Sequence, residues 1–147
     1  MRKWIGMIIG VILIIFVSLY WLNGQAFTEL ADNKTMAVQE GDFILHIRAE
    51  GVEGGFQVFK AIQYVGDESI EIKHQTPLVS VSVNHPNHDY TGSEVTNMLN
   101  TGNSYHPQKS KTFKIPEDGT YTLFCEARFA ADGEQMTITH QAELIFQ

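Results

Sequence analysis

A two-residue alternation of apolar and polar side chains recurs over most of the chain from Asp42 onward and limits it to β-structure. The alternation is clearest in "PLVSVSVN", Pro77–Asn84, and in "GTYTLFCEARF", Gly119–Phe129. In a strand with one buried face, every second residue is apolar. In an amphipathic helix, apolar residues recur about every 3.6 residues. Turn-forming clusters such as "GVEGG" and "ADGE" separate the alternating segments. The pattern therefore predicts an all-β domain, folded as a seven-stranded antiparallel sandwich.

The predicted strands differ in how regular their alternation is. In Phe56–Gly66 the alternation shifts part-way, which indicates a bent strand or a strand with a bulge. The seven predicted strands cover residues 42–50, 56–66, 69–74, 77–84, 111–115, 119–129 and 134–146.

The N-terminal segment is apolar and predicts a membrane anchor. Arg2 and Lys3 precede Trp4–Leu22, which is 19 residues without a charge. At about 1.5 Å per residue, a helix of this length roughly matches the hydrocarbon thickness of a bilayer. Because the basic pair lies before the apolar segment, we expect the N-terminus in the cytoplasm and the rest across the cell membrane. The predicted organisation is an N-terminal transmembrane helix within residues 1–26, a linker at 27–41 and an extracytoplasmic domain at 42–147.

A cleaved secretory signal is the alternative interpretation of the same segment. Gly24 and Ala26 are small residues at positions that suit a signal peptidase. The apolar run is longer than the usual 7–15 residues or so of a signal peptide, which favours a retained signal-anchor. With either interpretation, residues 27–147 lie outside the cytoplasm, and cleavage would make them a secreted protein.

The charge of the expected outer part restricts its partners. Ten Lys and Arg residues include Arg2 and Lys3, so eight remain against 17 acidic residues, a net charge of −9. Such a domain is repelled by nucleic acid and by anionic lipid surfaces. We therefore expect no nucleic-acid partner, and membrane contact only through the N-terminal helix. The expected partner is an unidentified protein or cell-envelope component.

The single cysteine, Cys125, excludes an internal disulfide. It falls on the same face of its strand as Tyr121 and Leu123, where burial is expected. The sequence has no nucleophile elbow, paired-carboxylate motif, phosphate-binding glycine loop or zinc-binding helix. The predicted protein is therefore not an enzyme, and no cofactor is expected.

The segment "PEDGTYTL", Pro116–Leu123, resembles the penultimate strand of immunoglobulin-like and fibronectin III-like sandwiches. The resemblance implies that the ring of Tyr121 packs at a corner of the sandwich and that its hydroxyl bonds back to the backbone. Leu123 stands where an antibody-type domain has its second cysteine, which excludes a disulfide-bridged domain of that kind. The motif indicates a fold and does not indicate a function.

A second resemblance concerns copper. The segment "GTYTLFCEARFAADGEQM" is similar to the end of a cupredoxin, which implies copper ligands at Cys125 and Met136. Arg128 stands near the place where a histidine ligand is needed, and a guanidinium has no free lone pair. This departure argues against a blue-copper site.

The polar stretch Val83–Lys111 is the main exception to the alternation and the predicted contact region. Within it, Ser93–Gly102 has the N-cap and the C-terminal glycine of a short helix. Unstructured loops longer than about 12–15 residues are usually binding elements or disordered. We therefore predict a binding module that contacts its partner through the 85–110 loop. The candidate contact residues are Tyr90, Met98, Leu99 and Tyr105, although Met98 and Leu99 could instead cap the core.

The histidines of this loop suggest an alternative function, a metal-binding or metal-delivery protein. His85, His88 and Asp89 form an H-x-x-H-D arrangement, and His106 lies at the far end of the loop. If the loop ends meet, two or three imidazoles and a carboxylate would suit zinc or copper(II). The spacing is not specific, and solvated loop histidines are the simpler interpretation.

Overall fold

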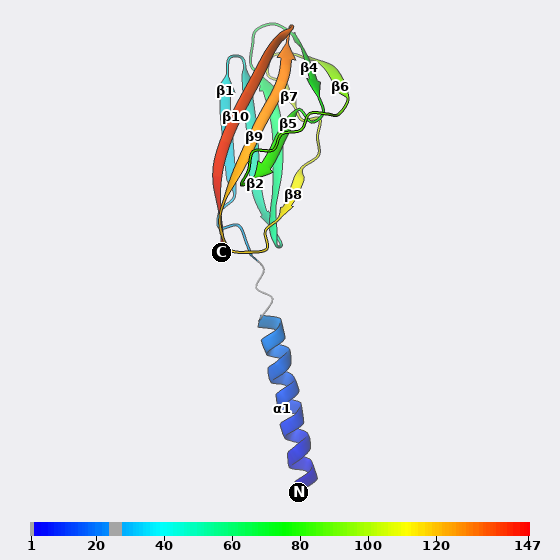
Figure 1. Ribbon diagram of the computed structural model, residues 1–147, viewed down its shortest axis with the longest axis vertical. Coiled ribbons are helices and arrows are strands. Elements are labelled where there is room, and N and C mark those ends of the chain that lie inside the picture. The colour runs from blue at the N-terminus through cyan, green and yellow to red at the C-terminus, as the bar shows by residue number, and fades with distance from the viewer. Residues whose placement is uncertain (1, 24–27) are drawn as a thin grey trace.

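The computed structural model describes residues 2–23 and 28–147, with side chains given for 9–20 and 28–147. It contains one helix, α1 (Arg2–Asn23), and two antiparallel β-sheets (Figure 1). The side chains of residues 9–20 are all exposed. Over the residues whose side chains are given, no helix has both the length and the apolar character needed to cross a membrane. The proposed cleavage residues Gly24 and Ala26 lie outside the described residues.

The described chain forms ten strands in two five-stranded sheets, so the all-β antiparallel prediction is confirmed and the number seven is wrong. The first sheet contains β1 (Lys34–Glu40), β2 (Phe43–Val52), β3 (Gly55–Tyr64), β7 (Ser104–Tyr105) and β8 (Lys111–Lys114). The second contains β4 (Ile70–Gln75), β5 (Val79–Val83), β6 (Glu94–Leu99), β9 (Gly119–Ala131) and β10 (Glu134–Phe146).

Tight turns join the longest strands where the sequence predicts them. The β9–β10 turn, predicted at "ADGE", places Asp132 and Gly133 at φ 47° and 85°. Positive φ at both central residues is the requirement of a type I′ hairpin turn, which matches the twist of the flanking strands. The two strands then pair along their whole length, from Glu134↔Ala131 to Phe146↔Gly119.

Residues 34–40, which the sequence assigned to a linker, form β1. This strand pairs with β2 from Lys34↔Ala49 to Glu40↔Phe43. It lies at the sheet edge and is only half-buried, so its apolar alternation is weak although its backbone pairing is complete. Before it, the backbone of Glu29 exchanges hydrogen bonds with Gln147 at 3.0 and 3.1 Å. The domain therefore begins earlier than its hydrophobic pattern indicates.

The helix predicted over Ser93–Gly102 is wrong, because Glu94–Leu99 is strand β6. It pairs with β4 from Ile70↔Leu99 to Gln75↔Glu94. Val95 and Leu99 are spaced four residues apart, which suits one face of a helix and also one face of a strand. The backbone ladder with β4 decides between the two, and local capping signals are overridden.

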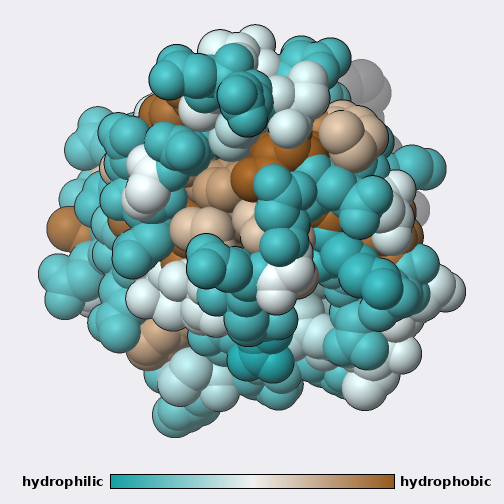
Figure 2. All heavy atoms as spheres, turned by 90° about the horizontal axis from the view of Figure 1, so that it is seen from above, coloured by the Kyte–Doolittle hydropathy of each residue, from teal (hydrophilic) through white to brown (hydrophobic). Residues whose placement is uncertain are grey.

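The two sheets pack face to face over a common core. The ring centroids of Phe43 in β2 and Phe129 in β9 are 4.8 Å apart, and those of Phe56 in β3 and Phe146 in β10 are 5.6 Å apart. Cys125 is 2% exposed in this core, which confirms the prediction of burial. Figure 2 shows one end of the molecule, where hydrophilic residues surround a small hydrophobic area near the centre.

Tyr121 makes the predicted corner contact. Its hydroxyl donates to the backbone carbonyl of Glu117 at 2.8 Å, and its ring meets Phe146 edge-on at 5.5 Å. This hydrogen bond joins the turn before β9 to the first residues of that strand.

Each sheet contains one strand that is interrupted. In the second sheet β4 and β5 both pair with β9, but pairing stops at Lys73 of β4 and resumes at Val79 of β5; we call residues 74–78, which lie opposite 128–129, the 74–78 break. In the first sheet β7 and β8 both pair with β3, and residues 106–110 lie opposite 59–61; we call this segment the 106–110 break. The register between β3 and β2 is continuous, so the bulge that was one alternative predicted within 56–66 is wrong, and the interruption lies in the strand on the other side of β3.

Candidate functional site

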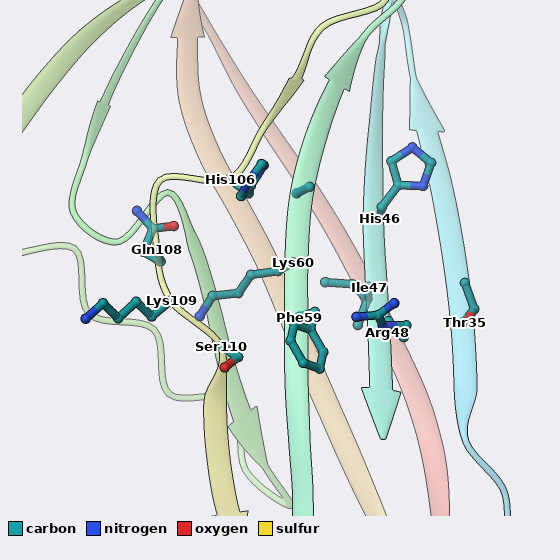
Figure 3. A pocket seen from close by; sticks show the side chains of 11 residues that line it. Thr35, His46, Ile47, Arg48, Phe59, Lys60, His106, Gln108, Lys109 and Ser110 are labelled. Atoms are coloured by element: carbon teal, nitrogen blue, oxygen red, sulfur yellow. The ribbon is translucent and has the colours of Figure 1, made fainter. Parts of the chain in front are cut away.

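An open cleft of about 440 Å³ crosses β1, β2 and β3 and ends at the 106–110 break (Figure 3). Cross-strand pairing aligns much of its floor, because Thr35 lies opposite Arg48 and Arg48 lies opposite Phe59. These residues point away from the core, on the outer face of the first sheet. The lining residues are Thr35, His46, Ile47, Arg48, Phe59, Lys60, Ala61, His106, Gln108, Lys109 and Ser110.

The charge of the cleft is opposite to that of the domain. Arg48, Lys60 and Lys109 line it, together with the imidazoles of His46 and His106. None of the acidic residues in the described part of the chain belongs to its lining. Three of the eight basic residues that follow the apolar segment are therefore gathered in one place, on a domain with a net charge of −9. A concave surface of one sign attracts ligands of the other sign.

Lys60 occupies a position that the strand pattern reserves for the core. It lies between Val58 and Ile62, both fully buried, and is itself half-buried. In Figure 3 its side chain extends from β3 toward the segment that carries Gln108, Lys109 and Ser110. Burial lowers the pKa of Lys60, and the nearby charge of Lys111 lowers it further. The charged ammonium is thus held in an environment that disfavours it.

Neither Lys60 nor Lys109 belongs to an ion pair among the described residues. The ion pairs found there join Arg48 to Glu50, Lys73 to Glu94 and Arg128 to Glu126, at 3.1, 3.2 and 3.0 Å. Arg48 also lies over the ring of Phe59, with 4.4 Å between the guanidinium carbon and the ring centroid. Arg48 is therefore held in place and paired with a carboxylate, whereas the two lysines have no carboxylate partner among the described residues.

The backbone of β3 is also incompletely paired beside the break. Tyr64 N–H donates to Asn103 and Ile115 N–H donates to Gly54, so the even-numbered residues of this strand face β7 and β8. In an antiparallel ladder, every second residue directs both its N–H and its C=O to the same neighbour. Lys60 therefore directs both groups to the 106–110 break, and residues 59–61 have no ladder partner there among the described strands.

The segment that forms the break is held mainly by one side-chain contact. Gln57 Nε2 donates to Ser110 Oγ at 2.5 Å. Within the described chain, no backbone–backbone hydrogen bond involves residues 106–110. Across the floor of the cleft, a hydrogen bond of 2.9 Å fixes the ring of His46 to Gln63. The cleft thus has a rigid sheet floor and one lightly tethered wall.

The four predicted contact residues do not converge on one surface. Leu99 is 2% exposed and lies in the core, while Met98 beside it is 55% exposed on β6. Tyr90 is buried: its hydroxyl donates to the Glu126 carbonyl at 2.9 Å, and Arg128 lies over its ring at 4.5 Å. Burial raises the pKa of Tyr90 far above its ordinary value.

Tyr105 also has a structural contact rather than an exposed one. A hydrogen bond of 2.9 Å joins its hydroxyl to Nε2 of buried His74. Of the predicted contact residues only Met98 is left exposed, and it lies on a different sheet from the cleft.

The three loop histidines are not grouped together in the structure. Among the described residues, no group of three or more His, Cys, Asp or Glu side chains is placed to hold a metal ion. The metal prediction assumed that the ends of the loop meet, but Val83 ends β5 in the second sheet and Tyr105 pairs in the first. His106 therefore lies in the cleft while His85 is exposed near the end of β5.

Cys125 does not add a reactive group to the molecule. Burial raises the pKa of its thiol to about 12, with Lys60 acting weakly in the opposite direction. The thiolate is the form that attacks or binds metals, so a thiol with this pKa is inert near neutral pH.

The cleft residues on β1, β2 and β3 escaped the sequence prediction, whereas those of the 106–110 break lie in the predicted contact loop, and one signal could have revealed the former. Lys60 interrupts an otherwise apolar inward series, Phe56, Val58 and Ile62, in β3. A lysine at such a position either snorkels to solvent or lines a cavity. His46, Arg48 and Lys109 give no such signal, because outward-facing charges are the ordinary decoration of a strand or loop. Comparison with known proteins shows no relative: no family model matches, and neither a curated protein nor a solved structure matches significantly.

Proposed function

We propose that this chain is a membrane-anchored, extracytoplasmic binding module without enzymatic activity, which contacts a protein or cell-envelope partner through the cleft beside the 106–110 break. The observation that carries the proposal is the concentration of basic side chains in this cleft, on a domain that is otherwise strongly acidic. Residues 106–110 also belong to the long polar stretch that the sequence singles out as a contact region.

The anchor is supported by the N-terminal sequence. Residues 4–22 carry no charge and follow a basic pair. Phe16 is 69% exposed and Ile14 is 67% exposed, so the apolar side chains of this helix are not covered by the sandwich. Apolar helical surface of this kind is stable in a lipid environment.

Membership of the immunoglobulin-like or fibronectin III-like sandwiches is part of the proposal and rests on two observations. The Tyr121–Glu117 hydrogen bond is of the kind found at the corner of such sandwiches. If β4 with β5 and β7 with β8 are each counted as one interrupted strand, β2 to β10 make seven strands, and β1 is an addition at the edge.

The test is cross-linking from the cleft in cells that produce the full-length chain. A photoreactive amino acid replaces His106, which is exposed in the cleft, or Ile145, which is 50% exposed on the other sheet. We expect a discrete cross-linked product from position 106 and none of that mass from position 145. Protease added outside intact cells should digest the domain. Equal products from both positions, or a protected domain, would contradict the proposal.

A further inference from the structure

The charges in the cleft define what kind of group can fill it. Lys60 and Lys109 form no ion pair among the described residues, and Lys60 is half-buried next to Lys111. A half-buried positive charge without a counter-charge, such as that of Lys60, is unfavourable. An anion that enters the cleft supplies this counter-charge, whereas a cation or a neutral polar group does not.

The form of the cleft indicates what carries the anion. It is an open groove across three strands, with Phe59, Ala61 and the aliphatic part of Lys60 in its lining. Small-molecule sites usually enclose most of their ligand, which this groove does not. An open groove with an apolar floor and an Arg stacked on an aromatic ring has the composition of a protein–protein contact surface.

The charge of the whole domain argues against a polyanion. A nucleic acid, a phosphate polymer or an anionic membrane brings many charges, and most would face the acidic remainder of the domain. One carboxylate on an otherwise uncharged segment meets the lysines and avoids this repulsion. The unpaired backbone N–H of Lys60 beside the break is a further donor for such a group.

We propose that the cleft binds an extended segment of a protein partner, in which an acidic side chain pairs with Lys60 and Lys109 and a neighbouring apolar side chain packs on Phe59. This inference rests on the proposed function and specifies its ligand. It also assigns separate tasks to the parts of the cleft: the lysines select charge, and the Arg48–Phe59 pair supplies the apolar contact.

The test measures binding of defined peptides to the full-length chain in nanodiscs of zwitterionic lipid. The probe is a fluorescent peptide with the sequence Gly-Ser-Phe-Glu-Phe-Ser-Gly, and the matched peptide has Gln in place of Glu. Fluorescence anisotropy at low salt should show the acidic peptide binding about tenfold more tightly than the Gln peptide, since one charge-assisted pair is worth about 1.5 kcal/mol or more.

Matched lysine variants locate the effect. Lys60→Gln and Lys109→Gln should each weaken binding of the acidic peptide about fivefold to tenfold and leave the Gln peptide unchanged. Lys114→Gln removes the same charge from an exposed site on β8, outside the cleft, and should change the affinity less than about twofold. Circular dichroism of each variant confirms that the fold is intact.

A second readout follows the lysine itself. Because a bound carboxylate favours the ammonium form, the lowered pKa of Lys60 should rise toward its ordinary value when the acidic peptide binds. The side-chain NMR signal of Lys60, assigned by its absence in Lys60→Gln, reports this change.

Three results would overturn the inference: equal binding of the two peptides, an equal effect of Lys114→Gln, or tighter binding of polyphosphate with the same lysine dependence. A cross-link from position 106 that persists in Lys60→Gln would refute the acidic ligand and leave the proposed function standing. Absence of any cross-link from position 106 when Lys60 and Lys109 are both present would refute both.

Discussion

The two interrupted strands each pair with a long strand of their sheet, and their interrupting residues differ in how far they enter the core. The 74–78 break is filled in part: Leu78 is fully buried and its carbonyl accepts a hydrogen bond from Arg128 N–H at 3.2 Å, while an opening of about 400 Å³ lined by Thr76 and Pro77 lies beside it. The 106–110 break stays outside the core and leaves the cleft of about 440 Å³ beside it. Strand interruption alone therefore does not decide whether the interrupting residues enter the core.

The side chains of the inserted residues account for the difference. In the 74–78 break, His74 is 3% exposed and both of its ring nitrogens have partners, the Gln75 carbonyl at 2.7 Å and the Tyr105 hydroxyl at 2.9 Å. Leu78 supplies apolar surface that is stabilised by burial. The 106–110 break has the sequence "HPQKS", which contains no large aliphatic side chain. Burial of these polar residues would add little apolar stabilisation, so they remain at the edge of the core.

The largest expected effect separates the two breaks by stability. Leu78→Ala should lower the free energy of unfolding by about 2–5 kcal/mol, because it opens a cavity in a fully packed site. Gln108→Ala in the other break should change it by less than about 0.5 kcal/mol. Urea denaturation of the two full-length variants in the same detergent measures both. Similar losses would show that the 106–110 break is also part of the packed core.

His74 provides a smaller test of the filled break. His74→Ala removes a buried hydrogen-bond partner of Tyr105 and should lower the free energy of unfolding by about 1–3 kcal/mol. Tyr105→Phe removes the same bond from the other side, and the two effects should not add in the double variant. Full additivity in the same denaturation assay would show that the bond does not couple the residues.

The pH dependence tests the unfavourable position of Lys60. Its pKa is lowered in the folded state, mainly by burial and then by Lys111, so between the folded and unfolded pKa values the unfolded chain binds more protons. The free energy of unfolding therefore rises with pH as the pH approaches 10.5, because the folded protein no longer holds a charged Lys60. At lower pH the destabilisation caused by this charge is fully present. Lys60→Met should be more stable than the unsubstituted protein near pH 7, and the difference should shrink as the pH rises. A difference that is constant with pH would contradict the lowered pKa.

Arg48 should have only a small effect on stability. Its ion pair with Glu50 is exposed, with 51% and 37% of the two side chains accessible, so Arg48→Ala should cost about 1 kcal/mol or less. We expect this variant to lose affinity for the acidic peptide and for the Gln peptide alike, because it removes apolar contact with Phe59. A loss confined to the acidic peptide would reassign Arg48 to charge selection.

The fold was predictable wherever a local pattern had one meaning. The alternation in Gly119–Phe129 and the Asp-Gly turn that follows suit only a paired strand, and Tyr121 and Cys125 take the positions that this strand implies. Strand β6 was mispredicted because its short apolar pattern suits two periods. Strand β1 was missed because an edge strand is held more by backbone pairing than by its apolar face.

The site was less predictable than the fold, because it depends on register between distant strands. His106 reaches the cleft because Tyr105 pairs with Ile62, and no local pattern encodes that pairing. The same register places His106 beside the first sheet, while His85 follows β5 of the second, so the two loop ends do not meet as the metal prediction assumed. Lys60 was the one residue whose position in its own strand indicated a cavity.

Amide hydrogen exchange of the full-length chain tests most directly whether the 106–110 break is an open, ligand-binding edge. The amide of Lys60 faces the break, while the amide of Arg128 bonds to Leu78 in the filled one. We predict that the Lys60 amide exchanges much faster than that of Arg128 in the free protein, and that the acidic peptide slows only the Lys60 amide. A Lys60 amide already protected in the free protein, or one that the peptide leaves unchanged, would contradict the account.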